Sequence, residues 1–311
     1  MNTYDIAVIG GGAAGLSAAL VLARARREVV VIDNGRPRNA PATHMQGFLS
    51  RDGMPPAELL AAGRTEVAGY GGEFVRGTVS GLTRSPSGTF EVLLEGGGTL
   101  LARRVLVTTG LSDRIPDIPG MTERWGRDLL HCPYCHGHEV RDQPLGVLGG
   151  TPGAVQHALL IRQWSPDVVF FPHTARLADS DRERLTARAI GIVEGDVAGL
   201  VVKDDRLCGV ELADGRLVPR TAVFVRPEFV GNSALVRGLG ARTDQAGWPL
   251  ADADGLTSVP GLWVAGNAAN PRAQVITAAG EGSAAAIAIN NDLTEEDVQD
   301  AVEAFRAVLP A

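Results

Sequence analysis

The chain has 311 residues, with 29 basic and 36 acidic side chains and a formal net charge of −7. Hydrophobic residues make up 45% and charged residues 21%, which is typical of a folded globular protein and excludes wholesale disorder. Because the net charge is negative and the sequence has no run of basic residues, nucleic acids and anionic membranes are not expected as main partners. The single lysine, Lys203, precedes two aspartates, so a P-loop GK[ST] site is excluded and a Schiff-base enzyme is disfavoured.

The first residues do not resemble a secretory signal, because they lack a basic segment, include Asp5 and are interrupted by glycines. No run of about 18 apolar residues predicts a transmembrane helix. Three cysteines are too few for a disulfide scaffold, and two of them form a C-x-x-C pair. We therefore expect a cytoplasmic protein that does not bind a membrane and uses this pair for redox or metal chemistry.

The first elements in chain order form a dinucleotide-binding pattern. Residues 4–9 predict a buried strand, 16–27 a helix and 28–32 a second strand, with a G-x-G-x-x-G loop between the first two. The glycines allow a tight turn, approach of backbone amides to a pyrophosphate and close helix packing, and an acid about twenty residues later can bind a ribose. The predicted contacts are Gly10, Gly12, Ala13, Ala14, Gly15 and Asp33. This pattern alone does not separate FAD from NAD.

Three later elements favour FAD. Residues 105–110 predict a strand ending in a glycine turn, residues 262–267 a strand entering a polar turn, and residues 274–290 a helix rich in small residues. This trio resembles the FAD-binding pattern of the two-dinucleotide-fold flavoproteins, in which the late turn holds the ribityl chain and the next helix points at the flavin. Asn267 stands where that family has an acid, and its amide can still bind a hydroxyl. The resemblance implies further FAD contacts at Arg38, Asn39, His44, Val79, Thr109, Gly110, Gly266, Asn267, Gln274 and Val275.

The densest chemistry lies at residues 131–139, HCPYCHGHE. Cys132 and Cys135 close a small, labile ring when oxidised, which suits disulfide exchange. Two other interpretations stay open, apart from a chance pair in a turn. Zinc would use both cysteines with His136 and His138, although no second distant ligand pair exists. A glutaredoxin also carries C-P-Y-C, but directly after its first strand rather than in mid-chain.

Motif and position together resemble the low-molecular-weight thioredoxin reductases over nearly the whole chain. The resemblance implies an α/β fold with a discontinuous FAD domain, residues 1–115 and 241–311, and a middle domain, residues 116–240, that carries the redox pair. It also implies a homodimer. By this likeness Cys135 faces the flavin and Cys132 exchanges with substrate.

The middle domain departs from that family. A reductase needs a second glycine fingerprint for NADPH, and residues 145–154 carry Thr151 and Pro152 within that loop. A side chain obstructs backbone approach to a pyrophosphate, and proline removes an amide donor. The arginine pair for the 2′-phosphate is missing, with Arg176 alone nearby. We expect a degenerate NADPH-type domain that has lost nicotinamide binding.

The redox motif departs as well, because His136 follows the second cysteine where the reductases have an acid. The run resembles the FAD-dependent dithiol oxidases of the gliotoxin and holomycin type, with supporting likeness at residues 38–53 and 273–282. This implies oxidation of a small natural-product dithiol, with O2 as acceptor giving H2O2. A histidine suits this role because imidazole takes a thiol proton near neutral pH. The implied catalytic residues are Cys132, Cys135, His136 and His138, with FAD as cofactor and no metal.

Two alternatives of function stay open. One is a disulfide reductase fed by ferredoxin or reduced flavin, or by NADPH if the middle site still binds it. The other is a non-enzymatic, redox-sensing flavoprotein. Outside the site, we expect Cys208 and His157 to be structural and residues 201–225 to form a hairpin layer. Residues 294–309 predict an amphipathic helix whose apolar face, Val298, Val302, Phe305 and Leu309, covers the FAD domain.

Overall fold

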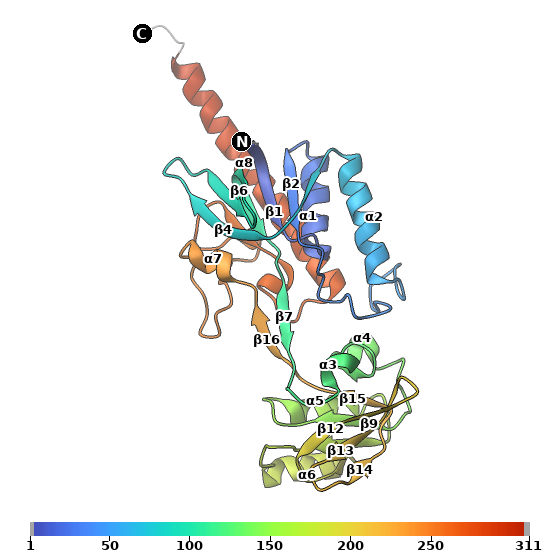
Figure 1. The fold of residues 1–311 in the computed structure, drawn as a ribbon. Coiled ribbons are helices and arrows are strands. Elements are labelled where there is room, and N and C mark those ends of the chain that lie inside the picture. The colour runs from blue at the N-terminus through green and yellow to red at the C-terminus, as the bar shows by residue number, and fades with distance from the viewer. Residues whose placement is uncertain (1–2, 308–311) are drawn as a thin grey trace. The chain divides into compact units, whose positions relative to one another are not determined.

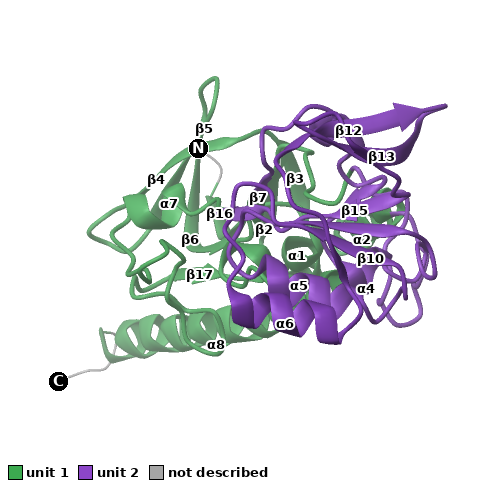
Figure 2. Ribbon diagram, turned by 90° about the horizontal axis from the view of Figure 1, so that it is seen from below, with its two compact units in different colours: residues 1–40, 56–112, 231–311 green, residues 41–55, 113–230 purple. Residues whose placement is uncertain are grey.

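The computed structural model describes residues 3–307, which separate into two compact units (Figure 2). Unit 1 holds residues 3–40, 56–112 and 231–307 of this range, and unit 2 holds residues 41–55 and 113–230. Along the chain, the segments of unit 2 are inserted between those of unit 1. Two segments fall differently from the predicted boundaries: residues 41–55 cluster with unit 2, and residues 231–240 cluster with unit 1.

Unit 1 is built on a seven-stranded sheet with the order β3-β2-β1-β6-β5-β4, in which β17 also pairs with β6 (Figure 1). The β1, β2, β3, β6 and β17 strands pair in parallel, and β4 and β5 add an antiparallel extension to β6. The carboxyl ends of the neighbouring strands β1, β6 and β17 therefore meet at one edge of the sheet. The strands are β1 (Thr3–Ile9), β2 (Val29–Asp33), β3 (Glu73–Arg76), β4 (Val79–Arg84), β5 (Phe90–Leu94), β6 (Thr99–Val107) and β17 (Leu262–Val264).

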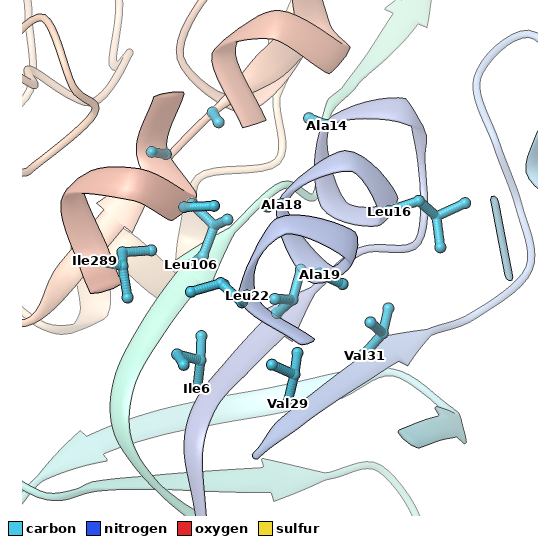
Figure 3. Packing of buried hydrophobic residues seen from close by; sticks show 14 of the residues in the cluster. Ile6, Ala14, Leu16, Ala18, Ala19, Leu22, Val29, Val31, Leu106 and Ile289 are labelled. Carbon is cyan, nitrogen blue, oxygen red and sulfur yellow. The ribbon is translucent and has the colours of Figure 1, made fainter. Parts of the chain in front are cut away.

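The central strands β1, β2 and β17 are buried on both faces, as expected for parallel strands. Along β1, Ile6 and Val8 join one hydrophobic cluster while Ala7 and Ile9 join another, because successive side chains point to opposite faces. Figure 3 shows the first cluster, where Ile6 and Leu106 of the sheet meet helices α1 and α8. The helices of unit 1 are α1 (Ala13–Arg24), α2 (Pro56–Gly69), α7 (Ala234–Gly238), the 3-10 turn η1 (Gly266–Ala268) and α8 (Val275–Ala307).

Helix α8 differs from the prediction of two helices over 274–290 and 294–309. Residues 275–307 form one continuous helix, in which Thr294 Oγ1 donates to the Asn290 carbonyl one turn earlier. The prediction that its last turns cover the first domain is wrong, because Val298, Val302 and Phe305 are 50%, 38% and 62% exposed. Leu309 lies outside the described residues.

Arginines rather than apolar contacts hold the second half of α8. Arg103 on β6 forms ion pairs with Asp5, Glu296 and Asp297 at 3.0, 2.9 and 2.6 Å. Beyond Leu293, no described residue of α8 is buried. The charge network therefore takes the place of the hydrophobic face that the sequence suggested.

Arg103→Ala is expected to lower the free energy of unfolding by about 1 kcal/mol and to accelerate hydrogen exchange in residues 294–307. Partly exposed ion pairs contribute little singly, but this guanidinium serves three carboxylates at once. The difference in the free energy of unfolding between wild type and Arg103→Ala should be smaller at high salt, because screening weakens ion pairs. Arg182→Ala, which removes a single exposed pair with Glu194, is the matched control, and an equal loss in both variants would count against the network.

Unit 2 contains a parallel sheet with the order β11-β10-β9-β15-β8 and a separate antiparallel sheet, β12-β13-β14. The predicted hairpin layer is confirmed for β12 to β14, but residues 222–224 join the parallel sheet as β15. The strands are β8 (Leu129–Leu130), β9 (Leu145–Leu148), β10 (Val168–Phe171), β11 (Gly191–Ile192), β12 (Val197–Lys203), β13 (Arg206–Leu212), β14 (Leu217–Val218) and β15 (Ala222–Phe224). The helices are α3 (Met121–Arg124), α4 (Pro133–His136), α5 (Ala154–Ile161) and α6 (Asp179–Ala187).

Two further strands, β7 (Leu111–Arg114) and β16 (Glu228–Gly231), pair with each other where the chain passes between the units. Within residues 3–307, no helix has the length and apolar character needed to cross a membrane.

Candidate functional site

The glycine loop after β1 has the geometry of an anion-binding turn. Gly10 has a φ of +112°, and a Cβ there would lie 2.4 Å from the Thr108 carbonyl oxygen. A Cβ at Gly15 would lie 1.9 Å from the Gly10 carbonyl oxygen, so both positions require glycine. At Gly12, by contrast, no described atom lies within 4 Å of the Cβ position, and no side chain caps α1. The first amides of α1 therefore face open space, which fits the diphosphate of a dinucleotide.

Gly12→Asp is expected to give a folded protein that binds FAD at least about 100-fold more weakly. The backbone at Gly12 has a φ of −80°, which any residue adopts, but the new carboxylate would lie where a phosphate binds. Fluorescence titration of FAD into the apoprotein measures the affinity, and circular dichroism checks the fold. Gly15→Ala is the contrasting variant and is expected not to fold. Wild-type affinity in Gly12→Asp would refute this placement of the phosphates.

Asp33 ends β2 beside this loop. Its Oδ2 forms an ion pair with Arg64 Nη2 at 2.6 Å, and its carboxylate packs against Gly11. The pair fixes the carboxylate at the loop, in a position where it can accept a hydrogen bond from a ribose hydroxyl. The sequence showed Asp33, but it gave no reason to single out Arg64.

The turn after β17 is organised by a residue that the sequence analysis did not single out. Both carboxylate oxygens of Glu281 are used, one by the Gly266 amide at 2.9 Å and one by Asn270 Nδ2 at 2.7 Å. Asn267 donates its amide hydrogens to the carbonyls of Asn270 and Ala273 at 2.9 and 3.0 Å. Only its Oδ1, which accepts weakly from Arg38 Nη1 at 3.4 Å, is left to face a hydroxyl.

The remaining predicted FAD contacts lie in unit 1, except His44. Thr109 is held by Asn232, whose carbonyl accepts from Thr109 Oγ1 and whose side-chain amide donates to the Thr109 carbonyl, both at 2.9 Å. Because β1, β6 and β17 are neighbours, the residues that follow them share one sheet edge. His44 instead belongs to unit 2, with the redox motif. The predicted FAD contacts that lie in unit 1 outside the glycine loop are Arg38, Asn39, Val79, Thr109, Gly110, Gly266, Asn267, Gln274 and Val275.

Cys132 and Cys135 form a disulfide in unit 2, with their Cα atoms 5.2 Å apart. Cys132 is the N-cap of α4, and its Sγ accepts a hydrogen bond from the Cys135 amide at 3.2 Å. A hydrogen bond to sulfur favours the thiolate over the thiol. The geometry therefore stabilises negative charge on Cys132 whenever the disulfide opens.

His136 ends α4, directly after the second cysteine. Burial lowers its pKa below the ordinary 6.5, and the Glu139 carboxylate opposes this shift only in part. A lowered pKa leaves the imidazole uncharged at neutral pH, ready to accept a proton. His138, two residues later, is exposed, so the structure gives the two histidines different surroundings.

A cavity of about 490 Å³ in unit 2 reaches the redox motif. Its wall includes the buried Arg124, whose guanidinium is fixed by Asp128 and Asp205. Cys135 and His136 line the cavity, whereas Cys132 and His138 do not, so it gives access to the Cys135 side of the disulfide. The lining residues are Thr43, His44, Gln46, Arg124, Gly126, Arg127, Asp128, Cys135, His136, Glu139, Asp204, Asp205 and Arg206.

The loop between β9 and α5 departs from an open nucleotide site. Thr151 Oγ1 is buried and has no hydrogen-bond partner among the described residues. A Cβ at Gly153, the N-cap of α5, would lie 2.8 Å from Nη1 of Arg226, so a guanidinium occupies this end of the helix. After β10, Nδ1 of His173 accepts a hydrogen bond from the Val197 amide at 2.9 Å, so His173 has a structural role.

Comparison with known proteins agrees with this geometry. The profile of the family described as "Pyridine nucleotide-disulphide oxidoreductase" matches residues 4–282. The chain belongs to this family. Its cofactor is FAD, and it is a flavin-dependent disulfide oxidoreductase.

Individual relatives confirm the predicted likeness to thioredoxin reductases. The chain is 31% identical to "Thioredoxin reductase sirT" of Leptosphaeria maculans, over 93% of this chain and 94% of the relative. The crystal structure of HlmI is 58% identical with a TM-score of 0.97, covering 99% of this chain and 98% of HlmI. A putative thioredoxin reductase TrxB from Bacillus anthracis is 34% identical with a TM-score of 0.90, covering 94% of this chain and 99% of that chain.

Proposed function

We propose that this flavoprotein is a dithiol oxidase that closes an intramolecular disulfide in a small natural-product dithiol, with O2 as final electron acceptor and H2O2 as product. The observation that carries the proposal is the pairing of a disulfide with an uncharged histidine in one short helix, since Cys132 caps α4, Cys135 lies within it and His136 ends it. A dithiol must lose two protons along with two electrons, so oxidation needs a base at the disulfide.

The loop of the middle unit supports the same direction of electron flow. The residues present do not fit a pyrophosphate, because Thr151 and Pro152 replace the open glycine backbone of the fingerprint. A middle unit that binds no nicotinamide removes NADPH as the electron donor, and in this proposal the substrate dithiol takes its place. We therefore propose that NADPH binding is lost.

The chemistry of the protein residues follows from their placement. His136 takes the proton of the first substrate thiol, and the resulting thiolate attacks Sγ of Cys132. The Cys132–Cys135 bond breaks, and its electron pair passes to Cys135 Sγ, which takes up a proton. The second substrate thiol, once deprotonated, attacks the substrate sulfur of the mixed disulfide and closes the product ring. This releases Cys132 as a thiolate, which the Cys135 amide stabilises.

In this half-reaction two electrons pass from the substrate dithiol to the protein disulfide, and of the two substrate protons one ends on Cys135 Sγ and the other on His136. We propose that His138, exposed beside the motif, exchanges protons between His136 and water. FAD, when bound by the unit 1 residues above, would supply the two-electron acceptor that reoxidises the Cys132–Cys135 dithiol by way of Cys135.

Anaerobic mixing tests the proposal. The yellow protein is mixed with NADPH and, separately, with a small dithiol, while the flavin absorption band is followed. The dithiol should bleach the band and NADPH should leave it unchanged, and air should then restore the colour with one H2O2 per dithiol. Rapid bleaching by NADPH would show that the middle loop still binds nicotinamide and would overturn the proposal.

A second candidate is a disulfide reductase fed by a donor other than NADPH, such as ferredoxin or reduced flavin. It is favoured by the names of relatives such as sirT and TrxB, which are described as thioredoxin reductases. Reduction of the flavin by such a donor, with no response to small dithiols, would support it. The likeness to thioredoxin reductases also leads us to propose a cytoplasmic homodimer, and light scattering tests the dimer.

A further inference from the structure

A buried histidine outside the proposed chemistry contacts the backbone of the redox motif. His157 lies on α5, the helix that follows the obstructed nucleotide loop, and is 5% exposed. Its Nε2 is 2.9 Å from the carbonyl oxygen of His131, the residue directly before Cys132. A carbonyl only accepts hydrogen bonds, so Nε2 carries the proton and donates it.

The surroundings of His157 keep this donor in place. Burial, together with the nearby His131 and Arg226, lowers its pKa to about 3, so the ring is uncharged at neutral pH. Its edge packs against Phe224, with ring centroids 6.0 Å apart and planes at 87°. Nδ1 is buried and finds no partner among the described residues, which leaves the bond to His131 as the polar contact of this ring.

The side chain of His131 is held independently of its carbonyl. Its Nδ1 donates to the Val225 carbonyl at 3.1 Å, and its ring meets Phe229 edge-to-face with centroids 5.2 Å apart. The residue before Cys132 is thus fixed both by α5 and by the chain after β15. Because the Cys132 Sγ must stay aligned with the Cys135 amide, a fixed backbone at 131–132 preserves that bond.

We propose that His157 is a positioning residue, which acts through the His131 carbonyl to hold Cys132 in the geometry that stabilises its thiolate. A helix of the degenerate nucleotide domain then supports the redox centre. The proposal rests on the proposed function only in taking Cys132 as the exchanging thiol.

The test measures the Cys132 thiol itself, in holoenzyme carrying Cys135→Ser, which keeps the backbone amide at position 135. The rate of alkylation by iodoacetamide at Cys132 is followed by mass spectrometry across pH, so Cys208 does not interfere. His157→Leu removes the donor, and His157→Gln retains an N–H on a side chain of similar reach. Ile161→Ala, at a buried position on the same helix, is the control for general loosening of α5.

His157→Leu is expected to slow alkylation at pH 7 by about three- to tenfold and to move the rate profile toward higher pH, because less of the thiol is ionised. His157→Gln and Ile161→Ala should stay within twofold of the parent. An unchanged rate in His157→Leu, or an equal loss in His157→Gln or Ile161→Ala, would overturn the proposal. The measurement uses neither a dithiol substrate nor O2, so its failure is distinct from failure of the oxidase assignment.

Discussion

Cys135→Ser is expected to abolish dithiol turnover, by at least about 10³-fold, while the purified protein stays yellow. Serine cannot form the disulfide with Cys132, so no two-electron acceptor remains for the substrate in unit 2. FAD should stay bound because the glycine loop and the Glu281 turn lie in unit 1. Peroxide formation with a small dithiol measures the activity, and the flavin absorption per polypeptide measures the bound cofactor.

Cys208→Ser provides the matched control, because it makes the same chemical change outside the redox motif. Cys208 lies half-buried on β13 and donates to the Val201 carbonyl at 3.3 Å, a bond that a hydroxyl can also make. The Cys208→Ser variant should therefore retain near-wild-type turnover of the dithiol. Full activity in Cys135→Ser would mean that the dithiol reduces the flavin directly, and a colourless variant would mean that the motif is needed to hold FAD.

The fold could be predicted where local patterns and long-range packing agree. The strand, glycine loop and helix from β1 to α1 follow from an apolar run, three glycines and an alanine-rich segment, and all appear as expected. The end of α8 was predicted wrongly because helical spacing of Val298, Val302 and Phe305 shows which residues share a face, not whether anything covers it. The partners of Arg103 lie 98 residues away at Asp5 and 193 residues away at Glu296, which no local pattern reveals.

The site could be predicted where a motif carries its own chemistry, and less well where contacts depend on distant residues. The C-x-x-C pair was evident from its spacing, and the disulfide is present. Thr151 and Pro152 predicted a loop that departs from the nucleotide-binding pattern. The contact of Arg226 with Gly153 could not be predicted, because Arg226 follows β15, far along the chain from this loop. Asn267 was expected to bind a hydroxyl through its amide, yet two backbone carbonyls of its own turn take the amide hydrogens. Nothing in the sequence pointed to the contact between His157 and the His131 carbonyl.

His136→Asn is expected to lower kcat/KM for the dithiol by about 10²- to 10³-fold at pH 7, within the range that a general base contributes. In the wild type, burial lowers the pKa of His136 below 6.5, so the base form predominates at neutral pH and activity should fall only as the pH drops below that value. Asparagine does not titrate, so the variant should lose this acidic limb.

The loss of activity in His136→Asn, relative to the wild type, should also become smaller as the pH rises. A substrate thiol with a pKa near 8.5 ionises without help above that pH, so the loss in His136→Asn should narrow to about tenfold or less near pH 9. His138→Asn, at an exposed position outside the cavity, should lose less than about fivefold at any pH. A loss in His136→Asn that stays constant with pH would assign His136 to holding α4 rather than to proton transfer. If His138→Asn instead removed the acidic limb, the base would be the exposed histidine, and the uncharged, half-buried His136 would serve only to shape the cavity beside Cys135.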